Sequence, residues 1–395
     1  MSHPADDDEA IERCRIESLK LLERNLTPHG VLAATRGSAA DARRYNRIFG
    51  RDAAICALAM CGSGVDALER GAVAGLDALA AQQAGNGQIP KYVDIDGREA
   101  DFWYLGCIDA TLWWLIAADH VRRTGTLPGS AGRWQAQIER ALAWLQAQEH
   151  PRFALLQQNE ASDWADIMPR SGYVLYSNAL WHRVKRRFGL ADADATRANF
   201  NELLQPFRGG RAGYHRTRLL QHYVRRARTD SGLYLSFLNF GCAGVEGDVF
   251  GNLLAILCGL AEPSAGLAIV RALQGAGAAD PHPIRVVLHP VARSHALWRP
   301  YMGRHSQNHP HQYHNGGLWP FVGGFWVQAL QRLGLGAEAR AALGRLAAVN
   351  ALDGWRFTEW LHGRTLAPMG MAGQSWNAAT FLLALRGLES GAEAW

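Results

Sequence analysis

The chain has 395 residues, 48% of them hydrophobic, which is enough for one large domain or two ordinary ones with a sizeable core. Charged residues make up only 19%, so carboxylates inside motifs are not easily dismissed as surface filler. The formal charge of +5 comes from dispersed basic residues with short clusters at 185–187 and 225–228. We expect these clusters to be solvated helix faces and exclude a nucleic-acid partner, because no basic stripe with interleaved aromatics is present.

The six cysteines form no CxxC pair, and several lie in apolar runs, which favours buried thiols in a reducing compartment. Residues 1–10 are acidic and lack the apolar region of a signal peptide. No uncharged apolar stretch reaches the length of a membrane span. We therefore expect a cytoplasmic protein without a membrane partner. The sequence leaves a homo-oligomer open.

Helical periodicity dominates the chain in order from the N-terminus. Amphipathic helices are predicted near 8–24, 52–62, 66–84, 107–124, 131–148, 175–188, 246–260, 264–274, 317–333, 336–349 and 375–387, with weaker ones near 197–205 and 213–227. Short strands are predicted at 91–95 and 284–289. No linker divides the chain, so we expect one domain over 1–395, with residues 1–8 disordered.

Long non-helical segments separate the helices at intervals. They span 85–105, 151–172, 229–246, 276–316 and 351–374, and are rich in Trp, Asn, Asp, His and Gly. Loops of this length in a compact domain are usually functional or disordered, and this composition favours function. About a dozen helices with such loops suggest an all-α helical toroid, a double ring of paired helices with loops over one mouth. A plain multi-helix bundle is the alternative.

The segment 163–170 is the most informative motif, because Asp163 and Asp166 flank Trp164. A carboxyl group beside an indole in a partly dry cleft can keep its proton near neutral pH, as a general acid requires. A Trp face is also a platform for a sugar ring. The segment therefore indicates carbohydrate chemistry, although a surface loop anchored by a buried Trp is the plainer alternative.

Further carboxylates stand in aromatic or helix-start settings. Glu359 lies in an aromatic loop and is the natural second carboxylate, with Gln374 and Trp376 at the next helix start. Asp52, preceded by Arg51, and Asp109 stand at helix starts. Either aspartate can be a helix cap, but the functional interpretation is that both bind sugar hydroxyls.

The segment 305–320 contains four histidines within ten residues, which raises a metal site as an alternative. The spacing fits no familiar zinc pattern and no cysteine lies near, so we expect neither metal nor cofactor. His314 and Asn315 offer neutral polar groups suited to hydroxyls. Gly316 and Gly317 would let the backbone approach a ligand closely.

Taken in order, these segments resemble the (α/α)6-toroid glycoside hydrolases, most closely the neutral/alkaline invertases, and also amylo-α-1,6-glucosidase-like proteins of the glycogen-debranching type. The invertase patterns Tyr-Asp-x-Val-Phe-x-Arg-Asp, Asp-Ser-Gly-Leu-Trp-Trp and Trp-Ile-Asp are similar to segments 45–52, 109–114 and 164–166. Tyr-His-Asn-Gly-Gly-Ser-Trp-Pro, Pro-Glu-Tyr and Gln-Thr-Trp are similar to 313–320, 358–360 and 374–376. The chain departs from the invertases after Asp166, at 167–170, where the aglycone side is expected.

The resemblance implies an inverting glycoside hydrolase that cleaves an α-glucosidic bond of a small carbohydrate. Asp166 would be the general acid, with a raised pKa, and Glu359 the general base, with a lower one. Their carboxyl groups should stand roughly 6.5–9.5 Å apart. The residues expected to bind the substrate are Arg51, Asp52, Asp109, Trp164, Arg170, His314, Asn315, Trp319, Gln374 and Trp376. Asp163 would be structural or border the aglycone.

Sucrose is the favoured substrate because the nearest motif set is that of the invertases. Another short α-glucoside, such as a glucosyl-glycerate or an α-1,6-linked oligosaccharide, is the first alternative. A sugar epimerase or isomerase on the same toroid, using histidines for proton transfer, is a second. A non-catalytic carbohydrate-binding protein is a third.

Overall fold

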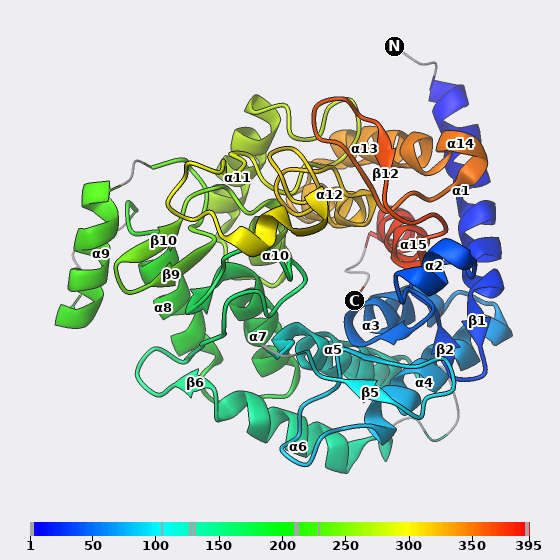
Figure 1. Ribbon diagram of the computed structural model, residues 1–395, viewed down its shortest axis with the longest axis horizontal. Coiled ribbons are helices and arrows are strands. Elements are labelled where there is room, and N and C mark those ends of the chain that lie inside the picture. Colours follow the sequence, from blue (N-terminus) through cyan, green and yellow to red (C-terminus); the bar gives the residue numbers. More distant parts are fainter. Residues whose placement is uncertain are drawn as a thin grey trace.

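Six helices form a closed inner ring in the computed structural model, which describes residues 4–103, 106–125, 129, 132–208, 213–227, 230–391 and 395 (Figure 1). In ring order they are α3 (Gly50–Met60), α5 (Ile108–Thr124), α7 (Leu175–Arg187), α10 (Val249–Leu257), α12 (Pro320–Arg332) and α15 (Ser375–Ser390). Each packs against the next, and α15 returns to α3.

A second helix covers each inner helix from outside. The outer partners, in the same order, are α4 (Asp66–Ala81), α6 (Gln135–Gln146), α8 (Ala193–Leu204), α11 (Pro263–Gly275), α13 (Gly336–Asn350) and α1 (Pro4–Arg24). The expected (α/α)6 toroid is therefore confirmed, and the plain bundle is excluded.

The burial of the two rings follows from their sequences. Every residue of α3 is buried, as are residues 108–121 of α5 and 320–330 of α12. Such helices are mostly apolar because neighbours enclose them on all sides, and their buried charged residues, such as Arg51, Asp52 and Asp109, stand near the helix starts. Outer helices such as α6 bury one stripe, here Ile138, Ala141 and Leu145, and leave the opposite face to solvent. The core thus lies between the rings and inside the inner one.

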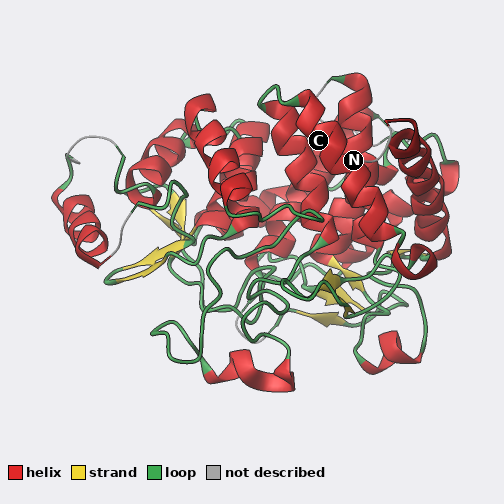
Figure 2. Ribbon diagram, turned by 90° about the horizontal axis from the view of Figure 1, so that it is seen from above, coloured by secondary structure: helices red, strands yellow, loops and turns green. Residues whose placement is uncertain are grey.

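Strands and long loops gather on one side of the helical layer (Figure 2). Two antiparallel three-stranded sheets are formed by β3 (Ile48–Phe49), β4 (Tyr92–Val93) and β5 (Ala100–Asp101), and by β8 (Tyr173–Val174), β9 (Phe237–Asn239) and β10 (Cys242–Gly244). Antiparallel pairs are β1 (Leu26–Thr27) with β2 (Gly30–Val31), β6 (Glu149–His150) with β7 (Leu155–Leu156), and β11 (Trp360–Leu361) with β12 (Pro368–Met369). Shorter or peripheral helices are α2 (Ser38–Ala42), α9 (His215–Ala227), the 3-10 helix η2 (Pro300–Ser306) and α14 (Leu352–Trp355).

All thirteen predicted helices are present within a few residues of their expected bounds. The strand expected at 91–95 is confirmed only over Tyr92–Val93. The strand expected at 284–289 is wrong, because this buried apolar segment makes only isolated bridges, from Arg285 to Leu318 and from Val287 to Asp248. Disorder was expected over 1–8, but residues 4–8 form the start of α1, and residues 1–3 lie outside the described part. None of the described helices combines the length and apolarity needed to cross a membrane.

Candidate active site

A cavity of about 290 Å³ contains both predicted catalytic carboxylates, Asp166 and Glu359. Its walls come from the first turn of α3, the starts of α12 and α15, and the loops between them. The lining residues are Arg43, Arg44, Tyr45, Phe49, Arg51, Asp52, Lys91, Tyr92, Trp103, Trp164, Asp166, Tyr313, His314, Trp319, Glu359 and Trp376. The ring closure therefore brings segments 45–52, 164–166, 313–319, 359 and 376 to one place.

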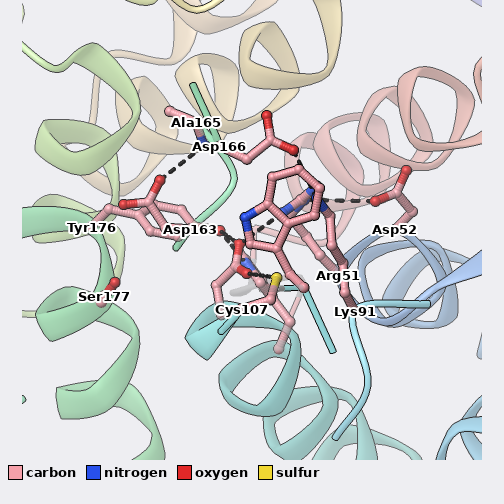
Figure 3. A network of polar contacts seen from close by, with 12 residues as sticks. Arg51, Asp52, Lys91, Cys107, Asp163, Ala165, Asp166, Tyr176 and Ser177 are labelled. Carbon is pink, nitrogen blue, oxygen red and sulfur yellow. Dashed lines mark hydrogen bonds and ion pairs between the residues drawn. The ribbon is translucent and has the colours of Figure 1, made fainter. Parts of the chain in front are cut away.

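Asp166 is paired with a cation. The Nζ atom of Lys91 donates a hydrogen bond to Oδ2 of Asp166 at 2.8 Å (Figure 3). Nδ1 of His314 lies 3.9 Å from Oδ1 of Asp166. The Asp166 side chain is 25% exposed. Burial alone would raise the pKa of Asp166, but the ammonium of Lys91 outweighs burial and holds this pKa below its usual value. Asp166 is therefore ionised at neutral pH in the unliganded protein.

Glu359 lies in the opposite electrostatic setting. It is 2% exposed, and it accepts hydrogen bonds from Oη of Tyr45 at 2.5 Å and from the backbone N–H of Met371 at 2.9 Å. Burial raises the pKa of Glu359 to about 7, although the bonds from Tyr45 and Met371 act in the opposite direction. The expected order of the two pKa values, with the acid high and the base low, is thus wrong for the unliganded protein. The reason is that burial raises the pKa of Glu359, whereas Lys91 lowers that of Asp166.

Arg51 links the pocket to the helical ring beneath it. Its Nη1 donates a hydrogen bond to Oδ2 of Asp109 at 2.9 Å. Its Nε lies 3.6 Å from Oδ2 of Asp52 (Figure 3). Burial raises the pKa of Asp52 to about 6, with Arg51 opposing that effect. Oδ2 of Asp52 has no hydrogen-bond partner within the described residues. Asp52 therefore lies at the pocket wall with Oδ2 enclosed beside Arg51, and its carboxylate lines the cavity.

Aromatic rings form the apolar wall. Trp164, Trp319 and Trp376 all line the cavity, as predicted, and the ring of Trp319 stacks on His314 with centroids 5.2 Å apart. Burial lowers the pKa of His314 to about 3, so its imidazole is neutral at physiological pH. A neutral ring beside tryptophan faces offers apolar contact and single hydrogen bonds to a sugar.

Four residues predicted to bind substrate lie outside the cavity lining: Asp109, Arg170, Asn315 and Gln374. The wholly buried Asp109 accepts hydrogen bonds from Arg51, from Tyr176 Oη at 3.0 Å and from the Cys107 thiol at 3.1 Å. It therefore anchors Arg51 from below.

The other three are also buried in the interior. Arg170 is 1% exposed and forms ion pairs with Glu246 and Asp248 at 3.4 and 3.2 Å. The side-chain amide of Asn315 is hydrogen-bonded to backbone groups of Val291 and Asn308. Gln374 is wholly enclosed at the start of α15.

Asp163 also lies outside the lining and is 1% exposed. Its two carboxylate oxygens accept hydrogen bonds from the backbone N–H of Ala165 and the amide of Gln158. Asp163 thus shapes the turn that presents Asp166, in agreement with the structural option considered for it.

Several lining residues were not predicted as site residues. Tyr45 and Tyr313 lie inside segments that carried the resemblance, and an aromatic hydroxyl beside a catalytic carboxylate is a signal that could have identified them. Arg43, Arg44 and Lys91 carried no local signal, because a lysine before a short strand and two arginines after a short helix are ordinary in sequence.

The histidine cluster is dispersed in the structure. His314 lines the cavity, whereas His309 stacks on Trp298 and His311 contacts Arg364 at 3.0 Å. Among the described residues, no group of three or more His, Cys, Asp or Glu side chains is placed to hold a metal ion.

Comparisons with known proteins bear on the family and the fold. Residues 229–390 match the family model for alkaline and neutral invertase. A search of curated proteins finds no significant match. The fold is similar to the GH63 mannosylglycerate hydrolase of Thermus thermophilus in complex with Tris and D-glycerate, with a TM-score of 0.66 and 14% identity over 93% of this chain and 99% of that one.

Two further solved structures have the same fold. The same Thermus thermophilus enzyme in complex with glucose aligns with a TM-score of 0.64 and 15% identity, over 93% of this chain and 99% of that one. A glycosidase carrying a Glu-to-Ala substitution, in complex with glucose, aligns with a TM-score of 0.63 and 16% identity over 98% and 99%. The expected resemblance to the (α/α)6-toroid glycoside hydrolases is confirmed, and the comparisons support a glycosidase.

Proposed function

We propose that the protein is an inverting glycoside hydrolase that cleaves an α-glucosidic bond of a small substrate. The observation that carries this proposal is the meeting of Asp166 and Glu359, distant in sequence, in one cavity with tryptophan walls. A paired-carboxylate site with aromatic faces is the arrangement that glycoside hydrolysis uses. A cavity of about 290 Å³ matches a small ligand.

In this mechanism Asp166 donates a proton to the departing glycosidic oxygen. Glu359 accepts a proton from a water molecule that attacks the anomeric carbon from the opposite face, and the new bond forms with inverted configuration. Glu359 also lines an adjoining cavity of about 490 Å³ on the side of Tyr45 and Tyr313, which gives that water a route. Arg51 and Asp52 are assigned to the hydroxyls of the glucosyl ring, and the tryptophans to its faces.

Sucrose stays the first candidate substrate, on the strength of the match of residues 229–390 to the invertase model. A glucosyl-glycerate is the second, and a specific observation favours it. Besides Arg51, the cations Arg43, Arg44 and Lys91 line the cavity, and sucrose has no negative charge for them to bind. A glycerate aglycone carries a carboxylate, and D-glycerate is bound in the Thermus thermophilus structure.

The test is a substrate screen followed by proton NMR of the anomeric signal. The panel contains sucrose, glucosyl-glycerate and an α-1,6-linked disaccharide. Release of β-glucose as the first product supports the proposal, whereas release of α-glucose contradicts the inverting assignment. Interconversion of a free sugar without hydrolysis would indicate an epimerase instead.

The roles of the two carboxylates are separated with α-glucosyl fluoride, whose leaving group departs without protonation. Asp166→Asn should hydrolyse the fluoride at a rate near that of the wild-type enzyme while losing about 10²-fold or more on the natural linkage. Glu359→Gln should be slow on both substrates. The reverse pattern would exchange the roles, and a variant that keeps most of its activity on every substrate has no catalytic role.

A further inference from the structure

Lys91 is a buried lysine at the cavity wall, and backbone hydrogen bonds fix its position. Only three of the 41 basic residues of the chain are lysines: Lys20, Lys91 and Lys185. A lysine in the cavity is therefore unusual for this sequence. The backbone of Lys91 is fixed on both sides, by bonds from the N–H of Gly50 to its carbonyl and from its N–H to the carbonyl of Asp101, each 2.8 Å. The residue is 6% exposed.

The ammonium group of Lys91 has two contacts at the cavity wall. It is 2.8 Å from Oδ2 of Asp166, and it lies over the ring of Trp103 at 3.5 Å from the centroid. A cation over an indole face keeps part of its stabilisation when its anionic partner changes. Lys91 can therefore exchange one carboxylate for another without being left unpaired.

The other charged and titratable groups near this pair are either bound to other partners or neutral. Arg51 is bound by Asp109 and Asp52. The thiol of Cys107 donates to Asp109, and burial raises its pKa well above the usual value, so it is neutral. His314 is neutral as well. Within the described part of the chain, Asp166 is thus the carboxylate that neutralises Lys91.

This pairing opposes the reaction assigned to Asp166. A carboxylate that accepts a hydrogen bond from an ammonium group is ionised, and an ionised group has no proton to donate to a leaving oxygen. A group that binds with the substrate and separates the two, or compensates the charge of Lys91, would increase the protonated fraction of Asp166. A negatively charged aglycone does both.

We propose that Lys91 binds a carboxylate on the aglycone. When the ammonium group of Lys91 leaves Asp166 for that carboxylate, Asp166 takes up a proton from solvent. The inference rests on the proposed hydrolase function. Charge and protons balance, because binding of the anion is coupled to uptake of one proton by Asp166. Asp166 gives that proton to the departing oxygen, Glu359 takes one from the attacking water and later releases it, and the anionic product frees Lys91 to pair again.

Lysine suits this exchange better than arginine. Its ammonium group is a compact point charge on a flexible stem, whereas a guanidinium group locks onto a carboxylate through two parallel bonds. Lys91→Arg should therefore keep the charge yet hold Asp166 more tightly.

The experiment uses two substrates that differ at one group, 2-O-α-glucosyl-glycerate with a carboxylate and 2-O-α-glucosyl-glycerol with a neutral hydroxymethyl group. The wild-type enzyme should prefer the glycerate by about tenfold or more in kcat/KM at pH 7. Lys91→Met should abolish this preference. It should also move the acid limb of the kcat/KM profile for the neutral substrate to higher pH, because that limb breaks at the lower of the two pKa values, that of Asp166, which Lys91 holds down. Lys20→Met, an exposed lysine of α1, is the matched control and should change neither result.

Proton uptake gives a readout that a structural role would not change. Calorimetric titration of the Glu359→Gln variant in buffers of different ionisation enthalpy should show nearly one proton taken up with glucosyl-glycerate and none with glucosyl-glycerol. In a Lys91→Met, Glu359→Gln double variant, the uptake with the glycerate should disappear.

The outcomes are distinct. Equal losses on both substrates in Lys91→Met, with no change in proton uptake, would make Lys91 a structural cation and overturn the inference. Discrimination that survives Lys91→Met but disappears in Arg44→Met would also overturn it, since the carboxylate would then bind Arg44. Failure of the wild-type enzyme to release β-glucose from any substrate, α-glucosyl fluoride included, would instead reject the proposed function.

Discussion

Tyr45 donates a 2.5 Å hydrogen bond to Glu359, and this contact joins the loop before α3 to the loop before α15. The bond lies on Oε1, while the backbone N–H of Met371 occupies Oε2. Both bonds stabilise the ionised carboxylate against a burial that favours the neutral form. Tyr45 therefore increases the fraction of Glu359 that is ionised, and so able to act as a base, near neutral pH.

Tyr45→Phe should raise the pKa of Glu359 further, because the ionised form loses a bond worth about 1.5 kcal/mol or more. Below the pKa of Glu359 its ionised fraction falls about tenfold when that pKa rises by one unit, whereas the acid limb, set by the lower pKa of Asp166, stays in place. The kcat/KM should therefore be roughly tenfold lower at pH 6 and should recover above pH 8. Tyr223→Phe, an exposed tyrosine on α9, is the control and should leave the profile in place. A uniform loss at every pH would contradict this role of Tyr45.

The same burial predicts a gain in stability for Glu359→Gln. A carboxyl group whose folded pKa of about 7 exceeds its unfolded value binds more protons when folded, so stability falls as pH rises between the two values. Above pH 7 the ionised Glu359 costs on the order of 3 kcal/mol. Urea unfolding should show the variant to be more stable than the wild type at pH 8, with the difference shrinking by pH 5. A difference that does not depend on pH would contradict the raised pKa.

Asp52 and Asp109 show how far sequence can carry such a site. Each is the acidic residue in the first turn of an inner helix, next to aromatic residues, and each belongs to a segment that resembles the invertases. The periodicity that predicted α3 and α5 also placed both aspartates at one mouth of the toroid. It could not predict that Asp52 lines the cavity while Asp109 lies beneath it, since that depends on the rotation of each helix in the ring.

The pairing of Asp166 with Lys91 was inaccessible from sequence for a different reason. The motif around Trp164 identified Asp166 because its chemistry is local. Lys91 lies beside Asp166 because of its place next to the small sheet of β3, β4 and β5, where backbone hydrogen bonds with Gly50 and Asp101 hold it. Contacts made by strands of two residues leave little periodic signal, so the electrostatics of the site were predicted in the wrong order.

The difference between Asp52 and Asp109 gives a third prediction. Asp109→Asn removes the main partner of a buried guanidinium group and should lower the free energy of unfolding by about 3 kcal/mol or more. If the variant folds at low temperature, its KM should rise less than that of Asp52→Asn, because Asp109 acts on the substrate only through Arg51. Asp52→Asn should do the opposite, with a small effect on unfolding and a rise in KM, because Asp52 faces the cavity. Denaturant titration and steady-state kinetics on both variants test this, and equal effects on KM would restore a substrate contact for Asp109.

Gly370 provides a way to disturb Glu359 without changing it. The backbone of Gly370 has a φ of +76°, which L side chains rarely adopt, and an added Cβ would lie 2.2 Å from Oε2 of Glu359. Gly370→Ala should therefore displace the carboxylate or the loop that carries Met371. We expect a loss of about 10²-fold in kcat on sugar substrates. Gly354→Ala is the matched control, because its φ is +73° and no atom lies within 4 Å of an added Cβ. Both variants carry the same backbone strain, so equal kcat values would show that the position of Glu359 does not limit turnover.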